Sequence, residues 1–436
     1  MFRVLSVIAL CFPLFSPASA RAETTVGQII GGGNVTLRES DYSRKFEILE
    51  KLGAGMCRIP VNESIYDPSK EKGPQPERLD AVILAAHRHG IEPILLFEYY
   101  TRWNGPLGGS DRWQAIGRAF AERFAPGSEW LRSQGIARWG VQTYSAINEP
   151  MWRANNPTPI DPKQYAAALK GLADGVHSVD PSLRVNPGGW QECPLFAGKN
   201  PFVAAVAPLF NTGKLDAVGI HRYWDVDYVP MTGRYDFSLQ YQFDKVKRAA
   251  GINDDVHFYT DEFNFKLREI SEEDAARDFL TAIFDALTVV DREGRPVTRF
   301  AMPWNIFHRA DRDEHYGLCT SDDPWQPTAR GRVLQMVCRL CRDARIVSCD
   351  PRSTGITVLE RAGAGDQIDR IWVWQNRRNW TDRPGSELTI GDLPDDARQL
   401  QVYDYDGLRQ TLDIADKTSI TVKDLPTEQT LIFVAK

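Results

Sequence analysis

The sequence lacks the features on which several common classes of protein depend. Its 52 Lys and Arg residues are outnumbered by 58 Asp and Glu residues, and the net charge of −6 leaves no basic excess for nucleic acid. Beyond the N-terminal region, no hydrophobic run is long enough to predict a transmembrane helix. The chain also has no internal repeat. We therefore expect a folded protein with no nucleic-acid partner and no membrane span in the mature chain.

Cysteine is scarce, with seven residues in 436. Four of the seven lie between residues 319 and 349, where one or two disulfides are expected in an oxidising compartment and buried thiols are the alternative. Cys338 and Cys341 have the C-x-x-C spacing of zinc ligands, but no second pair and no nearby histidine accompany them. The spacing therefore does not predict a zinc site.

Motifs for nucleotide, Schiff-base and metal chemistry are also missing. Gly31–Gly33 lacks the G-x-G-x-x-G spacing and the lysine of a phosphate loop, so we interpret it as a tight turn. No predicted strand ends in lysine, and only His221 and His308 are placed as metal ligands. The sequence therefore predicts neither a metal nor an organic cofactor.

The N-terminus has the pattern of an export signal. Arg3 precedes the apolar stretch Val4–Phe15, and Ala18–Ala20 is a small-residue cleavage site, with Ala20–Ala22 as a second choice. An uncleaved anchor is the alternative. We expect residues 1–20 to be a cleaved signal peptide and the mature protein to be periplasmic or secreted.

From about residue 21 to 345, short apolar runs alternate with amphipathic helical runs. Eight such runs predict strands: Val26–Ile30, Gly55–Val61, Ile91–Phe97, Trp139–Ile147, Leu183–Asn186, Ala217–Tyr223, His257–Glu262 and Arg299–Ile306. Eight predicted helices alternate with them: Tyr42–Leu52, Pro76–His89, Arg112–Arg123, Pro162–Val179, Pro201–Phe210, Leu239–Ala249, Ser271–Val290 and Thr328–Cys341. This α/β pattern predicts a (β/α)8 TIM barrel, with an open doubly wound sheet as the alternative.

The pattern changes over residues 346–436. Short β-branched or alternating runs are separated there by clusters of Pro, Gly and Asp: Gly355–Leu359, Arg370–Gln375, Glu387–Ile390, Gln399–Tyr403, Ser419–Val422 and Gln429–Val434. We expect a C-terminal antiparallel β-sandwich domain after the barrel.

Two glutamates follow predicted barrel strands. Glu149 lies in the motif Asn148-Glu149-Pro150 after the fourth strand, and Glu262 ends the seventh. Paired carboxyl groups at the carboxyl ends of barrel strands predict acid/base cleavage of a glycosidic bond. Asp261 competes with Glu262, because neighbouring side chains of a strand point to opposite faces and only one of the two is expected to face the barrel axis.

Other polar and aromatic residues lie on further predicted strands or directly after them. Arg58 lies on the second strand, Glu98 and Tyr99 follow the third with Tyr100 and Trp103 nearby, His221 and Tyr223 lie on the sixth, and Trp304 lies on the eighth. A packing or structural role is the alternative for each of them. If the strands form a barrel, Glu98 and Tyr99, which directly follow a strand, line its open end as candidate substrate-binding residues.

The motif Asn148-Glu149-Pro150, with Thr260-Asp261-Glu262-Phe263, resembles the retaining glycoside hydrolases of clan A. Family thirty-nine, with a bacterial endoglycosidase that acts on exopolysaccharide, is nearest in appearance. The resemblance implies that Glu149 is the catalytic acid/base and Glu262 the nucleophile. Phe263–Asn264 departs from the Trp-Gly that usually follows the nucleophile.

The resemblance also implies substrate-binding positions. It assigns Arg58 to hold the nucleophile, Asn148 to bind the sugar 2-hydroxyl, His221 and Tyr223 to the polar end of strand six, and Trp304 to the floor under the cleaved sugar. The implied function is endo-acting hydrolysis of a secreted or cell-surface polysaccharide or oligosaccharide by double displacement. A non-catalytic polysaccharide-binding or envelope-assembly protein on the same scaffold is the alternative.

Overall fold

The computed structural model of the chain describes residues 24–67, 72–101, 107–154, 156–191, 200–223, 238–265, 270–307, 316–321, 323–350, 354–362, 368–376 and 385–436. The signal-like N-terminus, Trp103, Cys193 and His308 lie outside these ranges. Among the described residues, no helix combines the length and the apolarity that crossing a membrane requires.

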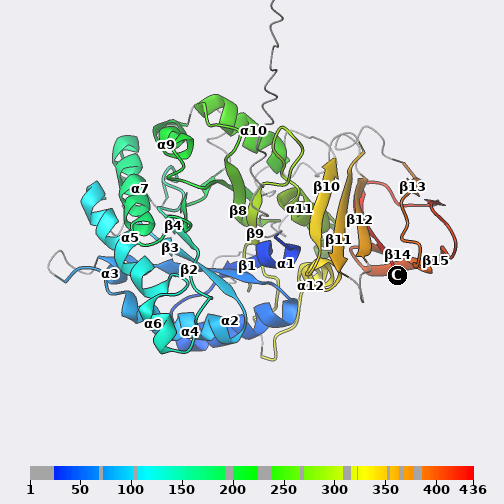
Figure 1. Ribbon diagram of the computed structural model, residues 1–436, viewed down its shortest axis with the longest axis horizontal. Helices are drawn as coiled ribbons and strands as arrows, with labels where there is room; N and C mark the ends of the chain where they lie inside the picture. The colour runs from blue at the N-terminus through cyan, green and yellow to red at the C-terminus, as the bar shows by residue number, and fades with distance from the viewer. Residues whose placement is uncertain are drawn as a thin grey trace, which may run out of the picture.

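Parallel strands form a closed barrel, as the alternating pattern predicted (Figure 1). The strands are β1 (Gly31–Asn34), β2 (Met56–Val61), β3 (Glu92–Phe97), β4 (Thr143–Ala146), β5 (Arg184–Pro187), β6 (Trp190–Gln191), β7 (Ala217–Tyr223), β8 (His257–Asn264) and β9 (Thr298–Pro303). They pair in the orders β1-β2-β3-β4-β5 and β6-β7-β8-β9. Only Gly188 and Gly189 separate β5 from β6. At the other edges of the two sheets, a parallel bridge from Ile30, just before β1, to Ala301 of β9 joins the sheets. With β5 and β6 as one bent strand, this is an eight-stranded barrel.

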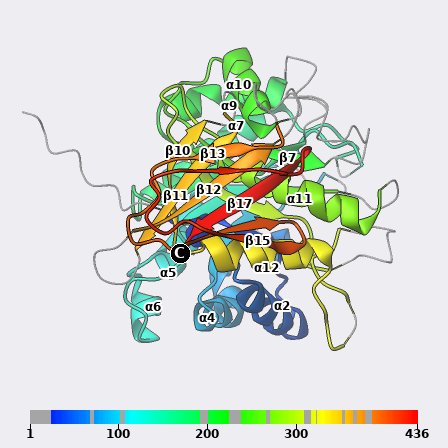
Figure 2. The same cartoon turned by 90° about the vertical axis from the view of Figure 1, so that its right-hand side faces the viewer.

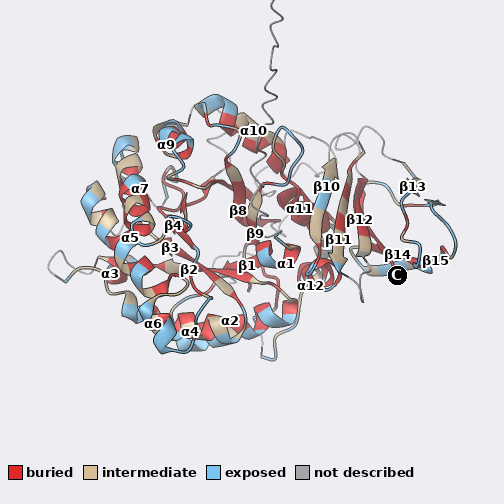
Figure 3. Ribbon diagram, in the orientation of Figure 1, coloured by how far each residue is buried: buried red, intermediate tan, exposed pale blue. Residues whose placement is uncertain are grey.

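Helices surround the barrel as an outer ring, apart from the short first helix, which lies next to β9 (Figure 1). They are α1 (Val26–Ile29), α2 (Glu39–Leu52), α3 (Glu63–Tyr66), the 3₁₀ turn η1 (Pro76–Leu79), α4 (Asp80–Arg88), α5 (Ser110–Phe124), α6 (Glu129–Ser133), α7 (Pro162–His177), α9 (Pro201–Asn211), α10 (Leu239–Ala250), α11 (Glu272–Leu287) and α12 (Ala329–Cys341). Their exposed residues lie on the outward faces (Figure 3). Side chains that accept backbone N–H groups begin several of them, including Asp161 at α7 and Thr328 at α12.

The start of the barrel differs from the sequence prediction. Val26–Ile30 was predicted as the first strand, but Val26–Ile29 is the helix α1, and Gly31–Gly33 is part of strand β1 and not a tight turn. A Cβ on Gly31 would lie 2.6 Å from Cγ of Met302 and 2.7 Å from the carbonyl oxygen of Met56. A side chain is therefore excluded at this point, and β propensity could not identify the strand.

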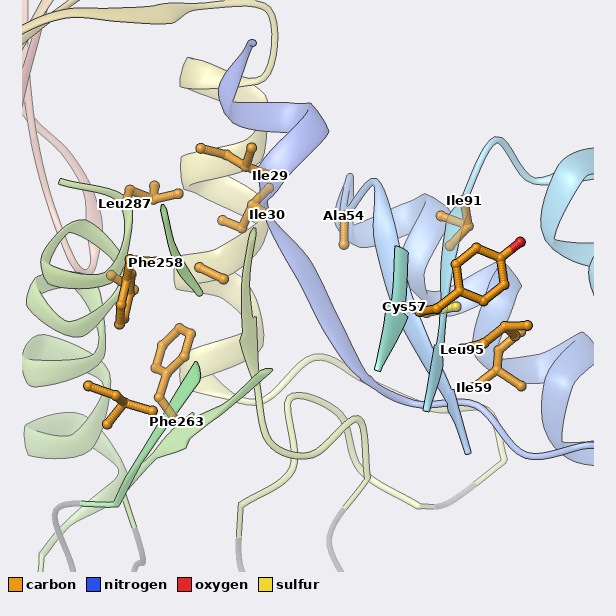
Figure 4. Packing of buried hydrophobic residues seen from close by; sticks show 14 of the residues in the cluster. Ile29, Ile30, Ala54, Cys57, Ile59, Ile91, Leu95, Phe258, Phe263 and Leu287 are labelled. Carbon is orange, nitrogen blue, oxygen red and sulfur yellow. The ribbon is translucent and has the colours of Figure 1, made fainter. Parts of the chain in front are cut away.

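Side chains of the barrel strands alternate between two cores. A small cluster shares the interior of the barrel: Met56, Ile94, Ala217, Tyr259, Phe300 and Met302. The main core lies between strands and helices, where Figure 4 shows Cys57, Ile59 and Leu95 on one side and Phe258 with Phe263 on the other. Because Met56 points inward and Cys57 outward, Arg58 on the same strand also points inward.

The C-terminal region is an antiparallel β-sandwich, as predicted (Figure 2). One sheet has the order β10-β11-β12-β17-β14-β15, and the second consists of β13 and β16. Their bounds are β10 (Arg345–Asp350), β11 (Ile356–Ala362), β12 (Ile368–Asn376), β17 (Gln429–Ala435), β14 (Gln399–Asp404), β15 (Gly407–Asp413), β13 (Leu388–Ile390) and β16 (Ile420–Val422). Trp372 and Trp374 pack between the two sheets, whereas Ile371 and Val373 join the main core. The division of the chain at residue 345 stays a prediction.

The cysteine cluster contains thiols where disulfides were expected. Cys57, Cys319, Cys338, Cys341 and Cys349 are free. Burial raises the pKa of Cys319, Cys338 and Cys341 to about 12 in each case. These side chains therefore behave as small apolar residues of the core.

Candidate active site

A buried cluster of charged side chains occupies the carboxyl-terminal end of the barrel. Arg58 comes from β2, Glu149 follows β4, His221 comes from β7, and Asp261 and Glu262 come from β8. The carboxyl ends of parallel barrel strands meet at one rim, so residues far apart in the chain are brought together there. A buried charge is costly unless an opposite charge or a hydrogen bond pairs with it, and ion pairs within the cluster provide these partners.

Arg58 binds two carboxylates at once. Its Nη1 donates to Oδ2 of Asp261 at 2.7 Å, and its Nη2 donates to Oε1 of Glu262 at 2.5 Å. The third donor, Nε, lies 2.6 Å from Oδ1 of Asn34 at the end of β1. Burial opposes the charge of Arg58, but the adjacent Asp261 and Glu262 raise its pKa. Arg58 is therefore a fixed cation that orients both acids.

His221 joins the two acidic sides of the cluster. Its Nδ1 lies 2.8 Å from Oε1 of Glu149, and its Nε2 lies 2.9 Å from Oδ1 of Asp261. Burial alone would lower the pKa of His221, but the charges of Glu262 and Asp261 outweigh it and raise the pKa to about 10. At neutral pH the ring is an imidazolium that donates a hydrogen bond from each nitrogen.

Glu149 and Glu262 face each other across a short gap. One carboxyl oxygen of each, together with a ring nitrogen of His221, lies within 4.8 Å of the others. Tyr223 donates from Oη to Oε2 of Glu262 at 2.6 Å, so Glu262 accepts hydrogen bonds on both of its oxygens. Burial raises the pKa of Glu149, the hydrogen bond from His221 opposes the rise, and the charge of Glu262 adds to it. The environment therefore favours a proton on Glu149.

The backbone that carries Glu149 is strained. Ile147 has φ of 64° and Glu149 has φ of 43°, both in the left-handed region that a β-branched residue strongly disfavours. The backbone N–H of Glu149 donates to the carbonyl oxygen of Gly189 at 3.1 Å, which stabilises the turn. Strain of this kind persists where the surrounding structure enforces it, often at functional sites.

Asn148 is buried beside Glu149. Its Oδ1 has no hydrogen-bond partner among the residues that the structure describes. An orphan buried acceptor is costly unless a ligand or water satisfies it. Asn148 is therefore suited to receive a hydroxyl group.

Glu98 and Trp304 lie around the cluster. Burial raises the pKa of Glu98, and the hydroxyl of Tyr100 lies 3.4 Å from its Oε1. Glu98 also lines a hollow of about 780 Å³ with Pro60, Asn62 and others. The guanidinium carbon of Arg58 lies 5.5 Å from the centre of the Trp304 ring. The charges of Arg58 and Glu262 also act on Glu98, so Glu98 lies between the cluster and this hollow.

Tyr99, predicted as a substrate-binding residue, packs into the main core, while its neighbour Tyr100 contacts Glu98. The predicted role of Tyr99 stays a prediction. Asn34 was not identified from the sequence, although a polar residue at the end of the first strand was a usable signal.

The expectation that only one of Asp261 and Glu262 faces the barrel axis is wrong. The register of β8 against β9 shifts between Thr260 and Phe263. Before the shift Tyr259 points into the barrel, and after it Phe263 packs outward against Phe279 of α11. The irregularity places both acids on the inner face, where each contacts Arg58.

The cluster is a poor metal site despite its ligand types. Glu149, His221 and Glu262 offer three ligand atoms, but metal binding requires a neutral histidine with a free nitrogen. Both nitrogens of His221 already contact carboxylates, and its pKa of about 10 keeps the ring protonated. The adjacent Arg58 would also repel a cation.

No model of a protein family matches the chain, and no curated protein sequence matches it. Solved structures do match. A family 39 glycoside hydrolase from Bacteroides cellulosilyticus WH2 superposes with a TM-score of 0.59 at 16% identity, covering 94% of this chain and 82% of that one. A glucosidase from Croceicoccus marinus superposes with a TM-score of 0.62 at 14% identity, covering 95% of this chain and 98% of that one. A GH30 endoxylanase from Clostridium papyrosolvens C71 superposes with a TM-score of 0.57 at 14% identity, covering 95% of this chain and 97% of that one. The chain thus has the fold of clan A glycoside hydrolases, with family 39 among its matches, as the motif resemblance implied.

Proposed function

We propose that this protein is a retaining glycoside hydrolase that acts by double displacement. The separation of the glutamates carries the proposal, because oxygens of Glu149 and Glu262 lie within 4.8 Å of each other. Carboxyl groups about 5–5.5 Å apart suit a covalent glycosyl-enzyme route, whereas inverting enzymes need a wider gap for water. The glycosidase names of proteins with this fold support the same chemistry.

In the first step Glu149 is the general acid. It donates its proton to the glycosidic oxygen while the carboxylate of Glu262 attacks the anomeric carbon from the opposite face. The bond from that carbon to the leaving oxygen breaks, and an ester to Glu262 forms. Arg58 and Tyr223 hold Glu262 in position for this attack.

In the second step Glu149 is the general base. The ester has removed the negative charge of Glu262, which had helped to raise the pKa of Glu149. Glu149 takes a proton from water, the water oxygen bonds to the anomeric carbon, and Glu262 leaves as a carboxylate. Two displacements at one carbon retain its configuration.

Residues around the glutamates are suited to hold the sugar. The unpartnered Oδ1 of Asn148 accepts a hydrogen bond from the 2-hydroxyl, an interaction that strengthens in the transition state. Trp304 supplies an apolar face under the ring, and Glu98 contacts a further hydroxyl at the edge of the hollow. The proposed substrate is a polysaccharide cleaved by endo action, and the hollow beside Glu98 is the candidate site for its further sugars.

The substrate lies outside the cell in this proposal. The apolar stretch Val4–Phe15 and the site Ala18–Ala20 support export and signal cleavage, which places the enzyme in the periplasm or the medium. Mass spectrometry of protein recovered from the periplasm or the medium tests this. A mature N-terminus at residue 21 is the expected result, and an intact N-terminus would contradict it.

The test of the catalytic assignment uses E149Q and E262Q on a polysaccharide that the wild type cleaves in a reducing-end screen. Each variant should lose at least about a thousandfold in kcat while remaining folded, because each removes one reacting group. E122Q, on the exposed face of α5, is the matched control and should retain full activity. NMR of the first product should show the anomeric configuration of the substrate. Initial inversion, or full activity of E262Q, would refute the double displacement.

A further inference from the structure

Asp261 lies between the two cations of the cluster. Its Oδ1 contacts Nε2 of His221 at 2.9 Å, and its Oδ2 contacts Nη1 of Arg58 at 2.7 Å. The side chain is buried, and Arg58 and His221 keep its pKa well below its usual range although burial opposes this. Each oxygen is thus committed to one cation, and the carboxylate joins them.

The two cations are the groups that hold the two glutamates. Arg58 binds Glu262 at 2.5 Å, and His221 binds Glu149 at 2.8 Å, with Oε2 of Glu262 further from the same ring nitrogen at 3.6 Å. Asp261 therefore closes a continuous chain of contacts from one glutamate to the other. The distance between the glutamates decides whether the reaction retains or inverts the sugar configuration. The contacts through Asp261 help to set that distance.

Asp261 also balances the charge of the buried cluster in both half-reactions. The proposed first step has Glu149 as the proton donor and Glu262 as the attacking carboxylate, so with Arg58, His221 and Asp261 the charges of the cluster sum to zero. In the ester Glu262 is neutral and Glu149 has become negative, so the sum is again zero. Without Asp261 the cluster would hold an uncompensated positive charge at both stages, which is costly in a buried site.

We propose that Asp261 is a positioning residue of the reaction: it holds His221 as a donor to Glu149 while it helps to orient the arginine that binds Glu262. This inference rests on the proposed function for its kinetic consequences. Asp261 is not assigned to touch substrate. The titratable and charged groups that surround His221 and Asp261 come from four elements and their ends: Arg58, Glu149, Tyr223, Tyr259 and Glu262.

The test is D261N, which keeps the shape of the side chain and removes its charge. We expect kcat to fall by about a hundredfold with little change in KM, because the variant misplaces the reacting groups without removing a substrate contact. NMR titration of the ring nitrogens should show the pKa of His221 lowered by about 1–3 units, since a nearby opposite charge has been lost. A residue with only a structural role would lower Tm without this change in the titration.

D216N is the matched control. Asp216, at the amino ends of the strands, contacts an arginine and a histidine in the same way: Nη2 of Arg299 at 2.8 Å and Nδ1 of His257 at 3.5 Å. Removing its charge should leave kcat and the pKa of His221 unchanged, because this cluster lies at the opposite end of the barrel.

The outcomes separate this inference from the proposed function. If E262Q loses activity while D261N keeps kcat within about twofold of wild type, the role of Asp261 is refuted and the hydrolase assignment stands. If E262Q remains active, the catalytic assignment itself fails. If D261N does not fold, titration of the wild type decides, because a pKa of His221 at or below its usual 6.5 would refute the arrangement.

Discussion

Single residues determine whether this cluster can form, and Gly189 is the clearest case. A Cβ on Gly189 would overlap Nε2 of His221 and lie 2.8 Å from Oδ1 of Asp261. The backbone between β5 and β6 therefore packs directly against the imidazole. Such a glycine is required by close approach to a side chain, with no positive φ involved.

We predict that Gly189→Ala lowers kcat by on the order of a hundredfold, because His221 must move away from Glu149. Enzyme kinetics with the same substrate measures this. Gly391→Ala is the control, since a Cβ there meets nothing within 4 Å, and it should be fully active. Full activity of Gly189→Ala would show that the imidazole is not held as described.

Sequence patterns identified much of the site at this level. Glu149 was found because it follows a predicted strand, and Arg58 and His221 because the resemblance to clan A assigns them; the structure brings all three together with Glu262. The inner position of both Asp261 and Glu262 could not be predicted, because alternation assumes a regular strand and the register shift in β8 appears only in its pairing with β9.

At the level of helices and strands, local signals explain where α7 begins. Asp161 accepts from the backbone N–H of Lys163 at 2.7 Å and of Gln164 at 3.0 Å, and Pro162 follows as the first helical residue. Both features are readable in the sequence. Strands without such signals, such as the glycine strand β1 and the largely exposed edge strand β15, were missed.

We predict that Asp161→Ala lowers the free energy of unfolding by about 1 kcal/mol, because two helix N–H groups lose their acceptor. Activity should be unchanged, since the cap lies on the outer ring of helices. Chemical denaturation measures the first effect and kinetics the second. Asp161→Ser is the control that restores a capping oxygen, and equal destabilisation by both substitutions would contradict the capping role.

For the whole molecule, the barrel and the C-terminal sheet share one core. Val434 of β17 and Ile371 of β12 lie in the same buried cluster as residues of α11, and Thr430 contacts Thr281 of α11 at 2.8 Å. Removing the sheet would expose this apolar surface to water. The sheet therefore contributes to the stability of the barrel, whatever else it does.

We predict that a chain truncated after Ala344 aggregates or unfolds at a lower temperature than the full chain, because the inner face of the sheet no longer covers α11. Light scattering and thermal unfolding measure this. A soluble, fully active truncated barrel would show that the shared core is dispensable. The full-length T430V variant, which removes one hydrogen bond at the same boundary, should by comparison remain folded.

The charged cluster also makes stability depend on pH. The pKa of His221 is raised from 6.5 to about 10, so its contribution is complete below about pH 6.5 and is lost as pH rises toward 10. The pKa of Asp261 is lowered from 3.8, so its contribution is present above that pH and is lost at lower pH. His221 and Asp261 therefore both stabilise the folded state in full only at pH values above the ordinary pKa of Asp, 3.8, and below the ordinary pKa of His, 6.5.

We predict that the free energy of unfolding falls between pH 7 and pH 10 by up to about 1.4 kcal/mol per pH unit from His221. His221→Gln should remove this part of the dependence. Denaturation curves of the two proteins at a series of pH values provide the measurement. Parallel pH dependence of the two proteins would contradict a charged His221 in the folded state.

Periodicity, turn residues and the Asn148-Glu149-Pro150 motif were enough to predict a (β/α)8 barrel, a β-sandwich and two facing glutamates, because these depend on local burial patterns and on strand ends that every such barrel brings to one rim. Three other features depend on which distant segments come within a few ångströms of each other. They are the absence of disulfides between the described cysteines, the glycine strand β1, and the contacts of Asp261 with His221 and Arg58. Such contacts arise between residues far apart in the chain, 203 positions for Arg58 and Asp261 and 204 for Arg58 and Glu262, and no local pattern encodes them.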